Sequence, residues 1–540
     1  MAFRFQLSKP RPPPSFDVLT ATADDIVKCL ESKSITSRQV VWSYLTQIQT
    51  HNIDRAKCYA VLCMDDEDRL MEIADRLDEE RRQGHLRGPL HGVPILLKDN
   101  IATEGKHLMT TAGSSALVPS STNNSPLVEN LINRGLIIIG KTNMTELCMK
   151  GVSGWSPLGW MCQPAYIPKG YRVGEGPRGE TSPGGSSTGS AVGVACGFAP
   201  ISVGTETYGT IATPAAAASL YSLKLTPGSI PMEGILQLTA SLDTVSTFGK
   251  TALDVALACD ALATSSEGPI LTSFVSSMEF EDVSVGFVDL KKWRLPAHFQ
   301  KFGPKYFEQI DREYKQAKDM LRESGVRVFD VWLTPPEEYM VDGMFINSLM
   351  RKIMMSQGKN GIERFLKGFN TCEARTLEEV IKVHNKWGPI ECPDGYCRDQ
   401  SMLEALIKES QPDHEISKWL EGCKRWASTN GVDRVMAEKG IDVVVCCSDS
   451  LFAGVSVAAR YPMAEIPLGY IESSGRPYGL QAIAKAHQEA KLVKFMAACE
   501  RVFPRRRVPD MEACEKARKH IGGWRPKTGW YIPSAPAKFV

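Results

Sequence analysis

The sequence lacks any marked excess of charge and any long apolar run. Its 540 residues carry 63 basic and 62 acidic side chains, so electrostatics give no reason to expect a nucleic acid or an anionic membrane as a partner. No stretch reaches the roughly 18 consecutive apolar residues that cross a bilayer, and the first residues lack the apolar core of a secretory leader. We therefore expect a cytoplasmic protein without a membrane span and without a nucleic-acid partner.

Motifs for metal and phosphate binding are lacking as well. The nine histidines are dispersed, and there is neither an HExxH helix nor a pair of CxxC knuckles. The fifteen cysteines show no regular spacing, which is typical of buried thiols. The glycine-rich stretch near the middle of the chain is not followed by Lys-Ser or Lys-Thr, as a phosphate-binding loop would be. We predict neither a metal nor another cofactor.

Short apolar runs and helical periodicity predict an α/β fold. The first 85 residues favour helices, with a capping box formed by Thr36 and Gln39. Val93–Leu97 and Leu136–Ile139 suit buried strands, and a helix over Pro126–Arg134 separates them. Further strands are predicted at Val283–Val288, Val326–Phe329 and Ile441–Val445, and helices over 304–323 and much of 337–440. The C-terminal half is therefore mainly helical.

Residues 181–228 are dense in glycine, serine and threonine. Interleaved apolar residues indicate that this segment is packed, since a flexible linker would lack them. Small side chains let backbones approach closely and leave main-chain N–H groups free, as an oxyanion site requires. Gly185–Gly189 also fits GxSxG, with Ser187 as nucleophile, but the preceding residues are too rich in glycine, proline and charge for the strand that this motif needs. A glycine-rich core without a catalytic role stays open here.

Lys98 follows directly on the apolar run Val93–Leu97. A lysine at such a position is more often a solvated charge than a catalyst. If the run carries it inward, burial lowers its pKa from about 10.4 toward neutrality, which makes the amine usable as a general base.

Five ordered blocks resemble the amidase signature family of serine-type amide hydrolases, with a pattern closest to fungal-type general amidases. The match covers roughly residues 20–505, in blocks at Gly92–Asn100, Thr110–Ser114, Gly140–Glu146, Pro183–Gly189 continued by Gly204–Gly228, and Tyr461–Gln481. The resemblance implies a central twisted mixed sheet covered by helices on both sides, in a single domain over 1–540. Its parts would be N-terminal helices (1–85), the signature core (86–270), a strand plus helical insertion (271–440), a return to the core (441–505) and a C-terminal tail (506–540).

The resemblance also implies a catalytic triad. By position, Lys98 is the base, Ser186 is a relay serine that follows a cis peptide bond, and Thr210 stands where the family normally has the serine nucleophile. A threonine keeps the hydroxyl, although its methyl group restricts χ1 and crowds the path of attack. The oxyanion hole and adjoining substrate-binding part would be formed by Thr207, Tyr208, Gly209 and Ser187.

Three positions depart from the family pattern. Tyr208 replaces a glycine, and if this backbone needs a positive φ, the tyrosine would be strained and the N–H donors misaimed. Glu206 replaces the usual aspartate, and Ala212 replaces a common arginine. Because both members of a supporting pair have changed, no orphan charge is expected.

The leading hypothesis is hydrolysis of a small-molecule carboxylic amide through an acyl-enzyme on Thr210. Two alternatives stay open, a catalytically silent amidase-fold protein that binds a ligand or partner, and an acyl transferase. Some family members act on glutamine in a complex that amidates transfer RNA, which the neutral net charge does not support.

Substrate choice is expected to lie in the loop from Trp155 to Arg178 and in the helical half. The loop's four aromatic side chains favour an apolar or aromatic acyl group, unless they simply pack the loop down. The oligomeric state stays open, with a homodimer among the alternatives.

Overall fold

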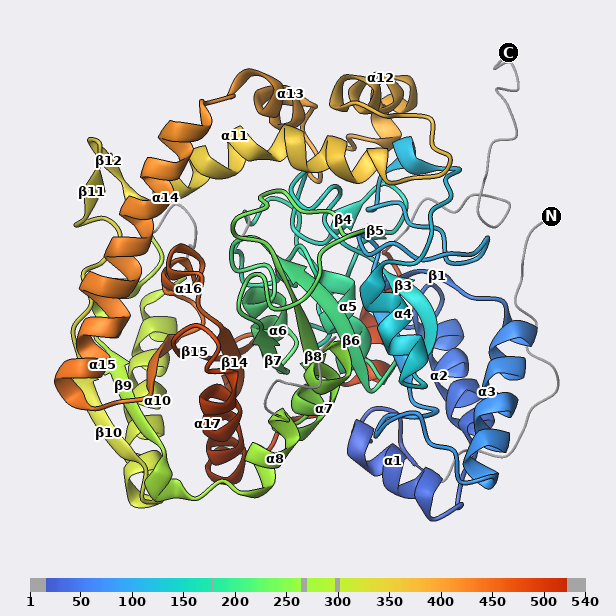
Figure 1. Ribbon diagram of the computed structural model, residues 1–540, viewed down its shortest axis with the longest axis horizontal. Coiled ribbons are helices and arrows are strands. Elements are labelled where there is room, and N and C mark those ends of the chain that lie inside the picture. The colour runs from blue at the N-terminus through green and yellow to red at the C-terminus, as the bar shows by residue number, and fades with distance from the viewer. Residues whose placement is uncertain (1–15, 177, 264–269, 297–301, 522–540) are drawn as a thin grey trace.

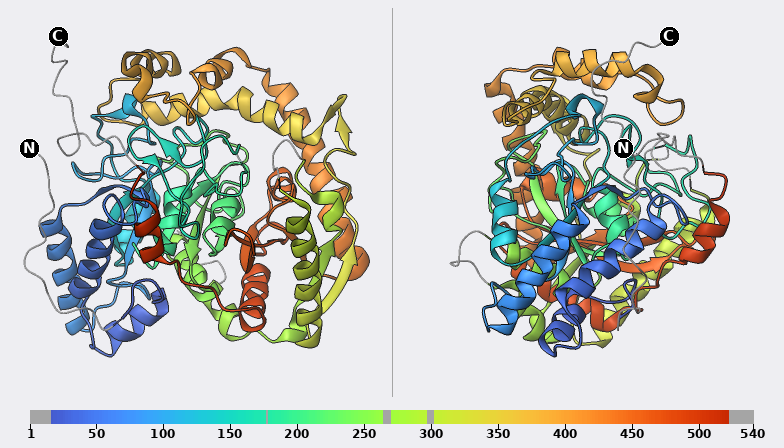
Figure 2. Two further views of the ribbon diagram at one scale, coloured as in Figure 1. Left: turned by 180° about the vertical axis from the view of Figure 1, so that it is seen from behind. Right: turned by 90° about the vertical axis from the view of Figure 1, so that its right-hand side faces the viewer.

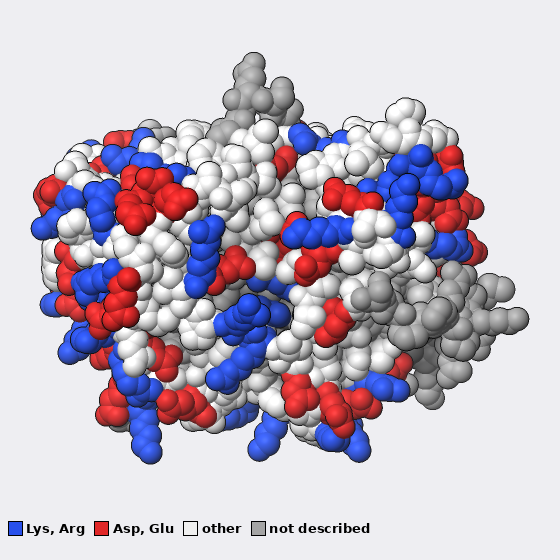
Figure 3. Space-filling view, turned by 90° about the horizontal axis from the view of Figure 1, so that it is seen from below, with Lys and Arg blue, Asp and Glu red and all other residues white. Residues whose placement is uncertain are grey.

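The computed structural model describes residues 16–176, 178–263, 270–296 and 302–521 (Figure 1). The first fifteen residues, which lack a leader's apolar core, and the end of the predicted tail after residue 521 lie outside these ranges. None of the described helices is long and apolar enough to cross a membrane. Basic and acidic side chains are interspersed over most of the face in Figure 3, as the balanced composition leads one to expect.

An 11-stranded mixed sheet runs through the molecule. In spatial order its strands are β1 (Val61–Met64), β3 (Ile137–Thr142), β2 (Pro94–Lys98), β6 (Ile201–Glu206), β8 (Thr244–Gly249), β7 (Tyr221–Lys224), β14 (Met463–Tyr470), β15 (Pro477–Ile483), β13 (Val443–Cys447), β9 (Ser284–Val288) and β10 (Arg327–Val331). Strands β3, β2 and β6 run parallel, as do β13, β9 and β10, while the strands between these groups pair antiparallel. β2, β3, β6 and β8 are buried at every residue, which explains their apolar sequences.

Helices cover both faces of this sheet (Figures 1 and 2). On one face α5 (Thr188–Ala195) and α6 (Ala212–Ala217) pack on each other and on β6 and β14, respectively. On the other face α7 (Ala252–Leu262) packs on β8 and on α17 (Glu489–Val502). The remaining helices outside the insertion are α1 (Ala23–Glu31), α2 (Ser37–His51), α3 (Glu67–Arg82), α4 (Pro126–Asn133), α8 (Leu271–Ser276), α9 (Leu290–Trp293), α10 (Pro304–Glu323), α16 (Ala453–Ala459) and α18 (Met511–Ala517).

The helical insertion arches over one side of the molecule (Figure 1). It consists of α11 (Ile346–Lys367), α12 (Leu377–Trp387), α13 (Ser401–Lys408), α14 (Asp413–Ala427) and α15 (Asp433–Lys439). Its apolar side chains, such as Leu366 and Leu377, join Ala116 and Leu147 from the core loops in an apolar cluster of their own. The short elements are the hairpins β4 (Trp155–Ser156) with β5 (Trp160–Met161) and β11 (Met340–Val341) with β12 (Met344–Phe345), and the turns η1 (Ser115–Leu117), η2 (Phe280–Asp282), η3 (Gly388–Ile390) and η4 (Ser428–Val432).

The predicted α/β fold is confirmed, and most predicted elements lie within two residues of their expected bounds. The capping box at the start of α2 forms as expected, with Gln39 N donating to Thr36 Oγ1 at 3.2 Å. The prediction of helices alone in the first 85 residues was wrong at β1, which pairs with β3 from a distant part of the chain. The antiparallel strands β8, β7, β14 and β15 were not predicted, because their sequences mix polar and small residues.

Candidate active site

Lys98 lies at the end of β2 and is fully buried. Its Nζ donates to Ser186 Oγ at 2.7 Å and to Thr205 Oγ1 at 2.9 Å, with the Thr205 carbonyl oxygen at 3.4 Å. Burial lowers the pKa of Lys98 below its ordinary value of 10.5, against the opposing effect of the neighbouring Cys148 and acidic groups. The apolar run before Lys98 thus does carry the amine inward.

The turn before α5 presents Ser186 to this amine. The Gly185–Ser186 peptide bond is cis, as the resemblance implied. The turn is too tight for a side chain at Gly185, since a β-carbon there would lie 2.8 Å from Thr145 Oγ1. Ser187, the next residue, is fully buried and its hydroxyl donates to the Thr205 carbonyl at 2.9 Å. Ser187 therefore ties the turn to the end of β6.

The loop after β6 carries Thr210, whose hydroxyl donates to the Thr205 carbonyl oxygen at 3.0 Å. The Thr207 backbone N–H reaches Thr210 Oγ1 at 3.4 Å. Among the hydrogen bonds of the described residues, the backbone N–H groups of Tyr208, Gly209 and Thr210 have no acceptor. Unpaired N–H groups at a partly exposed loop are donors available to a ligand.

Tyr208 is not strained. The residue with a positive φ in this loop is Gly209, at 67°, and Tyr208 is not among the non-glycine residues with positive φ. Its ring points toward the helices, where Tyr208 Oη donates to Asn347 Oδ1 at 3.2 Å. A β-carbon on Gly454 would lie 2.4 Å from the same hydroxyl. The tyrosine thus anchors the loop to α11 and α16, and the glycine takes the conformation that a side chain would resist.

Glu206 has a new role beside Ala212. Its Oε2 accepts from Ile211 N at 2.8 Å and from Ala212 N at 3.4 Å. The carboxylate therefore holds the backbone that follows Thr210, in place of the expected side-chain pair.

Of the predicted site residues, the structure brings Lys98 and Ser186 into direct contact. Thr210 is linked to Lys98 through Thr205, which hydrogen-bonds to both. No hydrogen bond between Ser186 and Thr210 occurs in the described parts of the chain.

Comparisons with known proteins agree with this geometry. The profile of the family described as Amidase matches residues 39–493. The chain belongs to the amidase family. Among its relatives are a probable amidase of Arabidopsis thaliana, 28% identical over 92% of both chains, and a putative amidase of Schizosaccharomyces pombe, 26% identical over 89% of this chain and 85% of that protein. The glutamyl-tRNA(Gln) amidotransferase of Staphylococcus saprophyticus also contains a relative, 26% identical over 89% of this chain and 97% of that polypeptide.

The fold of this amidase-family chain is also found among solved structures. It is similar to the structure of the peptide amidase of Stenotrophomonas maltophilia, with a TM-score of 0.79 and 26% identity over 91% of this chain and 99% of that one. The expected mixed sheet with helices on both faces is therefore the fold of a known amidase.

Four residues near the candidate site were missed by sequence reasoning. They are Thr205, Asp243, Cys148 and the side chain of Arg178. Burial raises the pKa of Asp243 to about 7, against the hydroxyls of Thr239 and Thr207. Asn100 Nδ2 lies 3.6 Å from Cys148 Sγ. No local pattern marks these residues, because their partners come from distant segments.

The aromatic residues of the 155–178 loop mostly pack that loop. Trp155 is fully buried in an apolar cluster with Met161 and Cys397. Tyr166 donates its hydroxyl hydrogen to the Arg507 carbonyl at 2.7 Å. The residue of this loop that lies beside Gly209 is Arg178.

One acidic cluster has the spacing of a metal site among the described residues. Ligating atoms of Glu146, His384 and Glu391 lie within 4.8 Å of one another. Lys150 Nζ, however, donates to Glu146 Oε2 at 2.5 Å and to Glu391 Oε2 at 2.9 Å. The ammonium already supplies the positive charge that a metal would bring, so the cluster is an ionic link between the core and the insertion.

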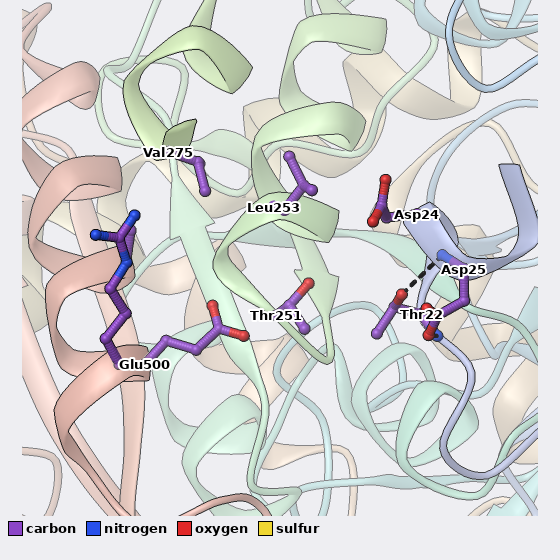
Figure 4. A pocket seen from close by; sticks show the side chains of 9 residues that line it. Thr22, Asp24, Asp25, Thr251, Leu253, Val275 and Glu500 are labelled. Carbon is purple, nitrogen blue, oxygen red and sulfur yellow. Dashed lines mark hydrogen bonds between the residues drawn. The ribbon is translucent and has the colours of Figure 1, made fainter. Parts of the chain in front are cut away.

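A surface pocket between α1, α7 and α17 lies apart from the candidate site, and none of the predicted site residues lines it (Figure 4). Its polar side chains already have backbone partners. Thr22 Oγ1 accepts from Asp25 N, Thr251 Oγ1 accepts from Asp254 N, and Glu500 Oε2 accepts from Ala252 N. These contacts cap helices and give the pocket no evident chemistry.

Proposed function

We propose that the protein hydrolyses a carboxylic amide through an acyl-enzyme on Thr210, with Lys98 as the base and Ser186 as the proton relay. The observation that carries this proposal is the buried Lys98 Nζ at 2.7 Å from Ser186 Oγ. It is supported by the unpaired N–H groups at Tyr208, Gly209 and Thr210. A buried amine and preorganised backbone donors are what amide cleavage without a metal requires.

The proton transfers follow from the contacts of Lys98. A neutral amine keeps two hydrogens, which suit Thr205 Oγ1 and the Thr205 carbonyl, and its lone pair can accept the Ser186 proton. Ser186 in turn accepts the proton of Thr210, once that hydroxyl turns from the Thr205 carbonyl toward it. Hydroxyl rotation about a single bond is rapid, and catalytic hydrogen bonds in unliganded sites are often formed only with substrate.

In the first half-reaction Thr210 Oγ1 bonds to the amide carbon, and the loop N–H groups stabilise the oxyanion. The C–N bond then breaks, and the proton held by Lys98 returns through Ser186 to the departing amine. In the second half-reaction water replaces the alcohol and loses its proton along the same path, releasing the acid. Ser187 acts as a positioning residue here, because its buried hydroxyl is bound to Thr205.

Intact-mass measurement after exposure to a fluorophosphonate tests the nucleophile. We expect a single adduct on the wild type, none on Thr210→Ala, and an adduct on the control variant Thr213→Ala, whose altered threonine lies in α6. An adduct that persists in Thr210→Ala would refute the assignment. No adduct on the wild type would instead favour a silent amidase-fold protein. Hydroxamate formation in excess of hydrolysis when hydroxylamine is added would favour acyl transfer.

A further inference from the structure

An arginine without a partner among the described residues stands next to the loop that carries Thr210. Arg178 ends the loop expected to set substrate choice, and a β-carbon on Gly209 would lie 3.5 Å from Arg178 Nη2. Arg178, Tyr208 and Thr210 are each partly exposed, whereas Lys98 and Ser186 are buried behind them. The guanidinium is therefore on the side from which a substrate reaches the nucleophile.

The guanidinium makes no hydrogen bond or ion pair with any residue that the structure describes, and its Nη1 is fully enclosed. The acidic groups around it are committed elsewhere. Both oxygens of Asp449 hold Arg476, at 2.6 and 2.9 Å, and Asp449 also accepts from Tyr306. Glu206 Oε2 is bound to the backbone that follows Thr210. Arg178 thus keeps its donors free within the described part of the chain.

A charged guanidinium without an acceptor is costly to enclose, because its hydration is lost and nothing replaces it. Burial lowers the pKa of Arg178, but an arginine in a protein keeps its charge. A planar group with a fork of N–H donors is suited to bind a carboxylate with two parallel hydrogen bonds. A doubly charged phosphate suits this place less well, since the carboxylates of Asp449 and Glu206 lie close to the guanidinium.

We propose that Arg178 binds a carboxylate on the acyl portion of the substrate, so that the preferred substrates are ω-carboxy amides. The acyl portion stays on the enzyme through both half-reactions, so a cation that holds it serves acylation and deacylation alike. This inference rests on the proposed amide hydrolysis at Thr210.

Turnover of succinamate, glutaramate and adipamate, each against a neutral amide of matched length, tests this substrate class. For the best length we expect kcat/KM to favour the carboxy amide by about 10- to 100-fold, the range of a charge-assisted hydrogen-bond pair. In Arg178→Gln this ratio should fall to near one, mainly through KM, and in Arg178→Lys it should be intermediate. Arg172→Gln is the matched control, because Arg172 is an exposed arginine of the same loop that pairs with Glu175.

Two results would overturn the proposal. One is a wild type that turns over the neutral amide as well as the carboxy amide at every length. The other is an equal loss on both substrates in Arg178→Gln and Arg178→Lys, which would indicate a purely structural arginine.

Calorimetric titration of glutaramate into Thr210→Ala separates this inference from the catalytic one. Binding that disappears in Thr210→Ala/Arg178→Gln supports the carboxylate site even if no turnover or adduct is ever found. Absence of binding to Thr210→Ala at millimolar ligand would refute the carboxylate site and leave the assignment of the nucleophile untouched.

Discussion

Removing the ammonium of Lys150 should destabilise the protein strongly. This side chain is fully buried and donates to Glu146 and Glu391, while His384 Nε2 lies 3.0 Å from Glu146 Oε1. The wild-type cluster balances two basic groups against two carboxylates. Lys150→Met keeps the length of the side chain but leaves two buried carboxylates facing one another with His384 alone. Breaking a buried ion pair in this way costs about 3–5 kcal/mol of unfolding free energy.

The cost should depend on pH. Burial and the neighbouring Glu146 already raise the pKa of Glu391 above its ordinary 4.5, and loss of Lys150 raises it further. The folded variant then holds a proton that the unfolded chain releases above this ordinary value, so its stability relative to the wild type falls as pH rises. Between about pH 8 and about pH 5 the deficit should shrink by about 1–2 kcal/mol, since one unit of pKa shift corresponds to about 1.4 kcal/mol.

Urea unfolding of both proteins at the two pH values measures this prediction. Lys418→Met serves as the control, because Lys418 pairs with Asp342 at 2.9 Å on the surface, with 60% of its side chain exposed. That variant should lose only about 0–1 kcal/mol. A loss below about 1 kcal/mol in Lys150→Met, or a loss that is the same at both pH values, would refute the assignment of Lys150 as the charge that holds the cluster together.

Three further predictions concern the candidate site. The unprotonated amine is the proposed base, and burial lowers the pKa of Lys98, so kcat/KM should rise with pH through one ionisation below 10.5; a Lys98→Ala variant that keeps both activity and this profile would rule the base out. Thr210→Ser removes the methyl group that restricts χ1 and should keep turnover or raise it by up to about tenfold, as steady-state kinetics on one amide will show. Tyr208→Phe loses the hydrogen bond to Asn347 and should cost about 1 kcal/mol of unfolding free energy, and an unchanged urea midpoint would contradict the anchoring role.

The sequence by itself determined the class of fold and the family. β2 and β3 are recognisable because strands buried on both faces need unbroken apolar runs. The cis bond before Ser186 and the contact between Ser186 and Lys98 were implied by ordered motifs, since the geometry they serve allows few other residues. Such features are written in neighbouring residues, and a sequence displays them directly.

Only the tertiary structure decided which side chains meet. Glu391 reaches Lys150 across 241 residues of chain, and nothing near either residue announces the other. Tyr208 turns outward to Asn347 because α11 and α16 pack over its loop, so the expected strain does not arise. Arg178 looks like one more charge of a polar loop until the fold sets it beside Gly209 with its acidic neighbours engaged elsewhere. Periodicity reports whether a residue is buried, but the partner that satisfies a buried charge is chosen by the packing of distant segments.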